Sequence, residues 1–235
     1  MKAILIPVKE FGEAKRRLAP HFSVEERVGL AEAMCADFFA VVAAVQGADR
    51  VFVASKEPRA LARASALGWE TIVESRQISE SNSVDEASRY CAERGVQSLL
   101  RLPVDLPLAR PNDIEALLEQ SEAAPSAILV PSSDGTGTNA LLRSPATLFP
   151  SHFGPDSFAL HLDEAKRCGA RTRVFRNPRL ELDIDELTDI QKLSLVLRGD
   201  SATYEWLYQH GKNGLKRSAS AGGRDPRTPT NGGRT

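Results

Sequence analysis

The sequence predicts a single α/β domain in which a mostly parallel sheet lies between two layers of helices, a three-layer sandwich. Apolar runs of strand length alternate with segments of helical periodicity, which is typical of a parallel sheet covered on both faces. With 235 residues, of which 42% are hydrophobic, the chain is long enough to bury one large core. A charged fraction of 26% is ordinary for a globular protein.

The first half of the chain repeats a strand–helix pair. Ser23 and Glu26 have the spacing of a capping box and predict the start of the first helix. Gly68 and Gly95 are expected to end the next two helices, because glycine adopts the left-handed conformation that often follows a helix. The expected elements are strand 3–8, helix 23–45, strand 50–55, helix 58–68, strand 70–75, helix 83–95, strand 98–104, helix 111–122 and strand 126–132.

After residue 132 the regular alternation of strand and helix patterns ends. Residues 133–157 are rich in Gly, Ser, Thr and Pro and are expected to form loops. The stretch LELDID (180–185) alternates apolar and acidic residues, which predicts a half-buried strand with Glu181, Asp183 and Asp185 on one face. The other expected elements are helix 158–169, strand 170–176, and helices 185–199 and 201–211.

Composition and charge narrow the class of protein. Residues 212–235 predict a disordered basic tail behind a domain of residues 1–211. A net charge of −1 favours neither a nucleic acid nor a membrane surface as partner. Cys35, Cys91 and Cys168 form no CxxC pair, so neither a disulfide framework nor a zinc site is indicated. We expect a cytoplasmic protein, because no segment reads as a signal peptide or a membrane span, with a homodimer as the base-rate expectation.

In an open parallel sheet the ligand crevice lies outside the carboxyl ends of the strands. The loop after the first strand, VKEFGEAKRRLA, carries Lys9, Lys15, Arg16 and Arg17 around one glycine, and such cations suit phosphate oxygens. The chain has neither a GxxxxGK[ST] loop nor a GxGxxG fingerprint. From this loop alone, a phosphate-binding loop and a solvated basic turn are equally good interpretations.

Three aspartates are candidate metal ligands. Asp105 stands between two apolar residues at a strand end, where desolvation is costly unless a cation meets it; an Asp that caps the following turn would look the same. On the expected strand, Asp183 and Asp185 share a face roughly 6 to 7 Å apart. Mg²⁺ takes a few carboxylates with waters and phosphates, so the three together would suffice. The alternatives are a solvated acidic edge strand, and Asp185 as the N-cap of the helix near Glu186.

Two further segments could receive an anion. The loop SSDGTGTNALLRSP has small residues that let backbone N–H groups approach an anion, with the hydroxyls of Thr136 and Thr138 as additional donors. The segment FGPDS places Gly154 and Ser157 just before a helix, where N–H groups favour a phosphate or carboxylate. A plain turn and a plain N-cap would give the same pattern. His161 is expected to be a packed or surface residue rather than a catalytic base.

Taken in order, the stretches IPVKEFGEAKRRLA, LPVDLPL, DGTGTNALLRSP, FGPDSFALH and LELDIDELTDI resemble the guanylyltransferase family that makes the activated phospho-acid intermediate of the deazaflavin cofactor coenzyme F-420. They span nearly all of residues 1–198. The resemblance implies a Rossmann-like, glycosyltransferase A-like nucleotidyltransferase fold. It also implies transfer of GMP from GTP to 2-phospho-L-lactate or phosphoenolpyruvate, with release of pyrophosphate.

The resemblance also implies roles for single residues. Transferred to this sequence, the family's pattern has the phospho-acid bound by Thr138, Gly154 and Ser157, Mg²⁺ held by Asp105, Asp183 and Asp185, and the nucleotide phosphates faced by Lys9, Lys15 and Arg17. Lys15 and Arg17 are then expected to act in catalysis by stabilising charge on the phosphates. The family's GLNxAL helix start beside the nucleotide base reads ESNSVDEA here, in which Asn82 keeps its place and the glycine and leucine are replaced.

Two other functions fit the same residues. One is a nucleotidyltransferase with 3-phosphoglycerate, a sugar phosphate or molybdopterin as acceptor. The absence of a GxGxR-type loop after the first strand counts against the last two acceptors. The other is a non-catalytic nucleotide-sensing protein, against which the complete set of aspartates argues.

Overall fold

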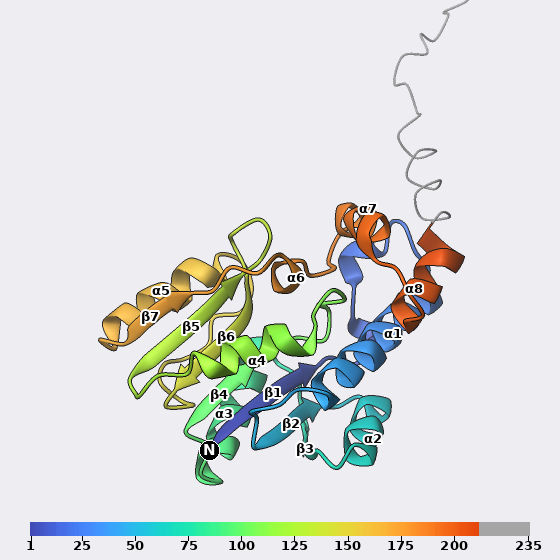
Figure 1. Ribbon diagram of the computed structural model, residues 1–235. Coiled ribbons are helices and arrows are strands. Elements are labelled where there is room, and N and C mark those ends of the chain that lie inside the picture. Colours follow the sequence, from blue (N-terminus) through green and yellow to red (C-terminus); the bar gives the residue numbers. More distant parts are fainter. Residues whose placement is uncertain (212–235) are drawn as a thin grey trace, which may run out of the picture.

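A seven-stranded sheet forms the centre of the computed structural model, which describes residues 1–211 (Figure 1). Its strands are β1 (Lys2–Val8), β2 (Arg50–Ser55), β3 (Glu70–Val73), β4 (Ser98–Arg101), β5 (Ser126–Pro131), β6 (Thr138–Ser144) and β7 (Arg171–Val174). In space they follow the order β3-β2-β1-β4-β6-β5-β7. β6 runs antiparallel to both neighbours and the other pairs are parallel, which confirms the predicted mostly parallel sheet. The tail predicted for residues 212–235 lies outside the described residues.

Helices cover both faces of the sheet, as the three-layer prediction requires (Figure 1). They are α1 (Val24–Ala43), α2 (Pro58–Ala66), α3 (Glu80–Glu93), α4 (Pro111–Glu119), α5 (Ser157–Arg167), α6 (Pro178–Glu181), α7 (Leu187–Val196) and α8 (Ala202–Trp206), with the short turns η1 (Phe11–Glu13), η2 (Arg16–Leu18) and η3 (Leu207–Gly211). Side chains of α3 and α5 pack on one face, and those of α1, α2, α4 and α6 on the other. α7 and α8 join a separate apolar cluster with α1.

The two layers follow from the alternation of side chains along each strand. On β1, Ile4 and Ile6 belong to the cluster with α1 and α4, whereas Ala3 and Leu5 belong to the cluster with α3. All four are fully buried. A strand that is covered on both faces reads as a continuous apolar run, which is why AILIPV could be identified from the sequence.

Several helix ends are confirmed. Ser23 and Glu26 form the predicted capping box at the start of α1, each side chain bonding the other's backbone N–H. Gly68 and Gly95 follow α2 and α3 with φ of +74° and +83°, the left-handed conformation in which a residue with a side chain would be strained.

The strand expected at LELDID is wrong. Residues 178–181 form the short helix α6, whose first turn is capped by the side chain of Asn177. The residues that follow have no strand partner. Leu180, Leu182 and Ile184 are nevertheless buried, and so is Glu181 between the first two. The apolar residues therefore reflect burial of a segment outside the sheet, without the two-residue alternation of a strand. The geometry inferred for Asp183 and Asp185 from a strand does not apply.

Two further expectations need correction. The segment 133–157 is not all loop, because it contains β6, every residue of which is buried. Its Thr, Asn, Arg and Ser side chains masked the strand in the sequence. Asp185 is not the N-cap of α7, because Glu186 holds that position, and the N–H groups of both residues donate to the carboxylate of Asp189.

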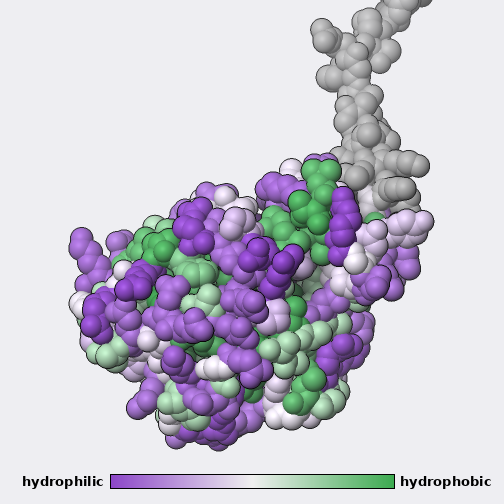
Figure 2. All heavy atoms as spheres, in the orientation of Figure 1, coloured by the Kyte–Doolittle hydropathy of each residue, from purple (hydrophilic) through white to green (hydrophobic). Residues whose placement is uncertain are grey.

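The surface is mostly polar on the face drawn in Figure 2. A hydrophobic patch stands out in the region of α7, where Leu195 and Val196 are exposed. Within residues 1–211, no helix combines the length and apolar character needed to cross a membrane.

Candidate active site at the carboxyl ends of the central strands

A cleft of about 580 Å³ opens beside the ends of β1 and β4. The loop after β1 lines it with Lys9, Lys15 and Arg17, and the segment after β4 contributes Asp105. The start of α3 closes a further side. The structure therefore brings together the basic loop and the aspartate that the sequence placed at strand ends.

Lys15 is the most enclosed of these cations, with its side chain only 8% exposed. Its Nζ donates to Asp105 Oδ2 at 2.6 Å and to Asp185 Oδ1 at 3.3 Å. Burial on its own would lower the pKa of Lys15, but the two carboxylates outweigh it and raise that pKa. In the same way, burial opposes the charge on Asp105, and the nearby ammonium holds the pKa of that carboxyl below its usual value. Lys15 therefore remains a cation that ties three segments together.

Asp183 has a different environment. Asn139 Nδ2 donates to its Oδ1 at 3.2 Å and also to the carbonyls of Leu180 and Glu181. Burial, followed by the charges of Asp105 and Asp185, raises the pKa of Asp183 to about 6. The three aspartates therefore lie close enough for their negative charges to repel one another. The ammonium of Lys15 donates to Asp105 and Asp185, and Asp183 is left with the raised pKa.

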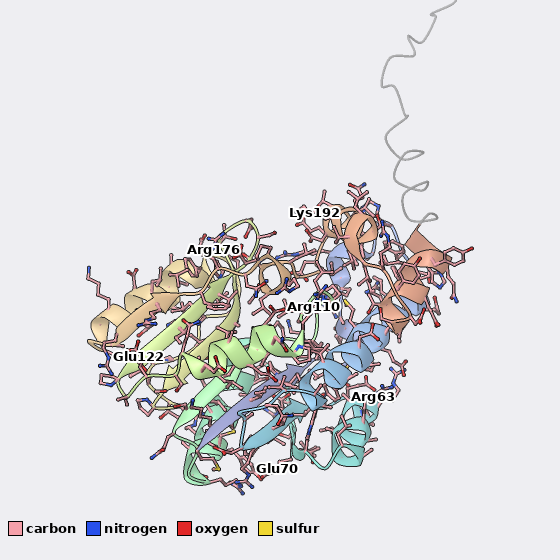
Figure 3. All side chains as sticks on the ribbon, in the orientation of Figure 1. Arg63, Glu70, Arg110, Glu122, Arg176 and Lys192 are labelled. Carbon is pink, nitrogen blue, oxygen red and sulfur yellow. The ribbon has the colours of Figure 1, made fainter. Side chains whose placement is uncertain are left out.

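The segment that carries Asp183 is anchored from both ends. Arg176, labelled in Figure 3, donates through Nε and Nη2 to the two carboxylate oxygens of Glu181, each at 2.9 Å. Ile184 N donates to the backbone carbonyl of Asp105 at 3.3 Å. These contacts replace the strand pairing that the sequence suggested, and they fix the aspartates beside the cleft.

The fit of a divalent cation to this set is partial. Carboxylate oxygens are the donors that Mg²⁺ prefers, and the raised pKa of Asp183 indicates a site short of positive charge. However, the ammonium of Lys15 stands between Asp105 and Asp185. Within residues 1–211, no group of three or more His, Cys, Asp and Glu side chains has the arrangement of a complete metal site. The protein therefore offers part of a coordination shell, which water and phosphate oxygens would have to complete.

Other predicted nucleotide-site residues are more loosely held. Arg17 is largely exposed, and its Nη1 is 3.5 Å from Asp185 Oδ2. Lys9 forms an ion pair with Glu80 at 3.2 Å. Asn82 lies in the first turn of α3, where its side chain donates to Glu86. The residues of this turn that line the cleft are its neighbours Ser79, Glu80 and Ser83.

Arg101 is a site residue that sequence reasoning missed. It is only 4% exposed, its Nη2 is paired with Glu80, and its Nη1 donates to the carbonyl of Asn139 at 3.1 Å. Its guanidinium lies 4.1 Å from the ring centroid of Phe153. Burial lowers the pKa of Arg101 to about 10, against the opposing effect of nearby aspartates. The available signal was a charge inside the apolar run SLLRLPV, which burial without a partner would make costly.

The predicted acid-binding residues form a second group next to this one. Thr138 opens β6 and Ser157 opens α5, and their hydroxyl oxygens are 3.4 Å apart. Gly154, with φ of +131°, accepts from the backbone N–H of Ser157. Arg101 connects the two groups, since it lines the cleft and also bonds the backbone at the start of β6. Thr136 Oγ1 donates to Asp134 Oδ2 at 2.9 Å.

His161 lies directly behind this second group. It is fully buried, so of the two environments expected from the sequence, packed or surface, it has the packed one. Its Nδ1 is 3.0 Å from Thr138 Oγ1. Ser157 and His161 are four residues apart on α5, so they share one face of the helix. That spacing was the signal in the sequence that linked the histidine to the predicted acid site.

Comparison with known proteins gives consistent matches. A family described as guanylyl transferase CofC like matches residues 1–224. The phosphoenolpyruvate guanylyltransferase of Rubrobacter xylanophilus is 38% identical over 191 residues, which cover 80% of this chain and 91% of that protein. The 2-phospho-L-lactate guanylyltransferase of Methanothermobacter thermautotrophicus is 31% identical over 198 residues, covering 84% and 86%.

Solved structures show the same fold at low identity. A nucleotidyl transferase from Methanothermobacter thermautotrophicus superposes with a TM-score of 0.56 at 16% identity, over 89% of this chain and 99% of that one. A cytidylyltransferase from Leptospira borgpetersenii gives 0.55 at 14% identity, over 90% and 94%. These likenesses confirm the predicted Rossmann-like nucleotidyltransferase architecture.

Proposed function

Because this chain belongs to the guanylyl transferase CofC-like family, we propose that it transfers GMP from GTP to a small phospho-acid and releases pyrophosphate, a step in coenzyme F-420 biosynthesis. The structural observation that supports this proposal is the cluster of Lys15, Asp105 and Asp185 beside a cleft of about 580 Å³. Cations and carboxylates held together at strand ends suit a reaction between two phosphate-bearing substrates.

In this proposal GTP occupies the cleft, with its phosphates toward the loop after β1. Lys9, Lys15 and Arg17 line the cleft and would offset the negative charge of the phosphates. Lys15 supplies a buried, preorganised charge, whereas the exposed Arg17 can turn toward the nucleotide. Asn82 remains the proposed contact near the base.

The phospho-acid would lie on the side of Thr138, Gly154 and Ser157. The hydroxyl of Thr138 can donate to an acceptor-only oxygen, the hydroxyl of Ser157 donates to Thr138 Oγ1, and the N-terminus of α5 favours an anion. Arg101 lies between this side and the cleft, so its guanidinium supports the approach of two anions to each other.

The reaction is a displacement at phosphorus. An oxygen of the acid's phosphate attacks the α-phosphorus of GTP and forms a new P–O bond. The bond from the α-phosphorus to the bridging oxygen breaks, and pyrophosphate leaves with that electron pair. No protein nucleophile takes part, and the residues named above position the reactants and stabilise charge.

Mg²⁺ is the proposed cofactor, and Asp105, Asp183 and Asp185 are the residues that would hold it. When bound, it would neutralise negative charge on the phosphates. The high pKa of Asp183 supports this proposal, because a cation would favour the ionised carboxylate.

Phosphoenolpyruvate is the acid we would test first. Two relatives named as phosphoenolpyruvate guanylyltransferases are each 38% identical to this chain, compared with 31% for a relative named for 2-phospho-L-lactate. This difference in sequence identity favours phosphoenolpyruvate as the substrate.

The test measures pyrophosphate release from the purified protein with Mg²⁺ and GTP. Phosphoenolpyruvate, 2-phospho-L-lactate and 3-phosphoglycerate are supplied in separate reactions, with a reaction lacking acid as control. We expect release with one of the first two acids. Release with 3-phosphoglycerate alone, or with none of the three, would contradict the proposal.

A further inference from the structure

A chain of hydrogen bonds runs from the backbone of His152 through His161 to Thr138. The N–H of His152 donates to His161 Nε2 at 2.8 Å. On the other side of the ring, Nδ1 is 3.0 Å from Thr138 Oγ1. Since Thr138 opens β6 next to Ser157, the chain ends at the proposed acid site.

The first bond fixes which ring nitrogen carries the hydrogen. A backbone N–H can only donate, so Nε2 of His161 must accept. A neutral imidazole has one N–H, which therefore lies on Nδ1. If the ring were doubly protonated, its Nε2–H would face the backbone N–H of His152, and this hydrogen bond could not form.

The surroundings keep this ring neutral. Burial, followed by the charge of Arg143, lowers the pKa of His161 to about 3. His152 and Arg101 act in the same direction, and the carboxylate of Glu164 opposes them. Aromatic rings, those of Phe149 and Phe153, lie against the imidazole with centroids 6.2 Å and 4.9 Å away.

The position of the ring hydrogen decides the direction of the next bond. With the hydrogen on Nδ1, His161 donates and the oxygen of Thr138 accepts. The hydroxyl of Ser157 is also a donor toward that oxygen, at 3.4 Å. The hydrogen of Thr138 is therefore left for another acceptor.

We propose that His161 is a positioning residue, which orients the Thr138 hydroxyl so that its hydrogen meets an acceptor oxygen of the phospho-acid. With the other tautomer, Thr138 would donate to the ring and present only lone pairs to an anion. The ring therefore selects for acceptor-only oxygens, those of phosphate or carboxylate. This inference rests on the proposed function, because it takes Thr138 as a ligand of the acid.

The first test measures the tautomer directly, without substrate. In protein labelled with ¹⁵N at histidine, long-range ¹H–¹⁵N spectra distinguish a protonated ring nitrogen from an unprotonated one. We expect His161 to show hydrogen on Nδ1 and none on Nε2, and to remain neutral from pH 8 to pH 5. Hydrogen on Nε2, or a doubly protonated ring in this range, would overturn the inference.

The second test compares His161→Asn with His161→Leu. The two side chains have similar shapes, and both leave the N–H of His152 without its acceptor. Only Asn can donate to Thr138, because its Nδ2, like Nδ1 of histidine, is bonded to Cγ. We expect the KM for phosphoenolpyruvate to be roughly three- to tenfold higher in the Leu variant than in the Asn variant, with equal KM values for GTP.

Thr138→Val completes a double-mutant cycle. Without the hydroxyl, Asn and Leu at position 161 should give the same KM for phosphoenolpyruvate, because nothing remains to be oriented. Phe149→Leu is the packing control, since it loosens the pocket around the ring and leaves the hydrogen bonds in place. We expect no selective rise in the KM for the acid in this control.

The outcomes separate this inference from the proposed function. Equal KM values for the acid in the Asn and Leu variants, with Thr138 intact, would overturn the role of His161. If the wild-type protein has hydrogen on Nδ1 but releases no pyrophosphate with any of the three acids, the proposed guanylyl transfer fails while the orientation of Thr138 stands.

Discussion

The ammonium of Lys15 lies 2.6 Å from Oδ2 of Asp105, although 90 residues separate them in the sequence. The bond joins the loop after β1 to the segment after β4. The same ammonium contacts Asp185 at 3.3 Å, so one side chain connects three parts of the proposed active site.

Replacing Lys15 tests this connection. Lys15→Met should leave two partly buried carboxylates without their cation, at a cost of about 3 kcal/mol in the free energy of unfolding. It should also reduce pyrophosphate release by roughly 100-fold or more, because a preorganised charge beside the phosphates is lost. Chemical denaturation and the pyrophosphate assay measure the two effects.

Lys192→Met is the matched control. Lys192, labelled in Figure 3, is exposed and pairs with Asp189 on α7 at 3.4 Å. Its loss should change the unfolding free energy by less than about 0.5 kcal/mol. Wild-type turnover in Lys15→Met would exclude Lys15 from the reaction.

Asp183 should make stability depend on pH. Its pKa is raised from 3.8 to about 6, so between these values the folded state holds a proton that the unfolded state has released. The contribution of Asp183 to the unfolding free energy therefore falls as pH rises through this window. Asp183→Asn should be more stable than the wild type at pH 7.5, by on the order of 2 kcal/mol, and the difference should disappear by about pH 4.

Denaturation curves across pH 4 to 8 measure this difference. Asp163→Asn, on the exposed side of α5, is the control and should follow the wild type. A constant difference between Asp183→Asn and the wild type across the range would contradict the assigned cause.

The third prediction concerns the effect of Mg²⁺ on stability. Mg²⁺ added to the wild-type protein at pH 7.5 should raise the Tm, and a chelator should reverse the change, because the cation favours the ionised form of Asp183. In Asp183→Asn the increase should be much smaller. Sodium chloride at equal ionic strength controls for screening. An equal increase in Tm in the variant would argue against Asp183 as a ligand.

Glu80 is expected to restrain two cations of the site. It pairs with Lys9 at 3.2 Å and with the buried Arg101. Glu80→Gln should lower the unfolding free energy by about 3 kcal/mol, since Arg101 loses its carboxylate. The freed cations should bind phosphates better, so the KM for GTP should fall by roughly threefold or more and should depend more strongly on salt.

Glu93→Gln, an exposed position near the end of the same helix, is the control. It should change neither stability nor the KM for GTP. A KM for GTP that is unchanged or higher in Glu80→Gln would contradict the restraint.

The sequence was sufficient where one segment determines the outcome. The apolar run of β1, the capping box at Ser23 and the glycines after α2 and α3 are local signals, and the structure contains all of them. The meeting of the basic loop with Asp105 also followed from the sequence, because the carboxyl ends of parallel strands share one edge of the sheet.

The sequence was insufficient where a distant side chain determines the outcome. LELDID alternates like a strand, but Asn139 and Arg176 bond this segment and it lies outside the sheet. The polar residues of β6 argued against a strand until their partners were known. Arg143, for example, is fully buried and donates to Ser88 on α3. Arg101 and Glu80 pair only after folding brings β4 to α3.

The register of the antiparallel strand β6 also determines which side chains face the two groups of site residues. Its first residues, Thr138 and Asn139, point to opposite faces of the sheet, the former to His161 and the latter to Asp183. Because side chains alternate, a slip of one residue would exchange them and present an amide to the acid and a hydroxyl to the aspartate. Under the proposed function, an insertion in the turn before β6 that shifts this register should therefore disturb the acid site and the aspartate site together.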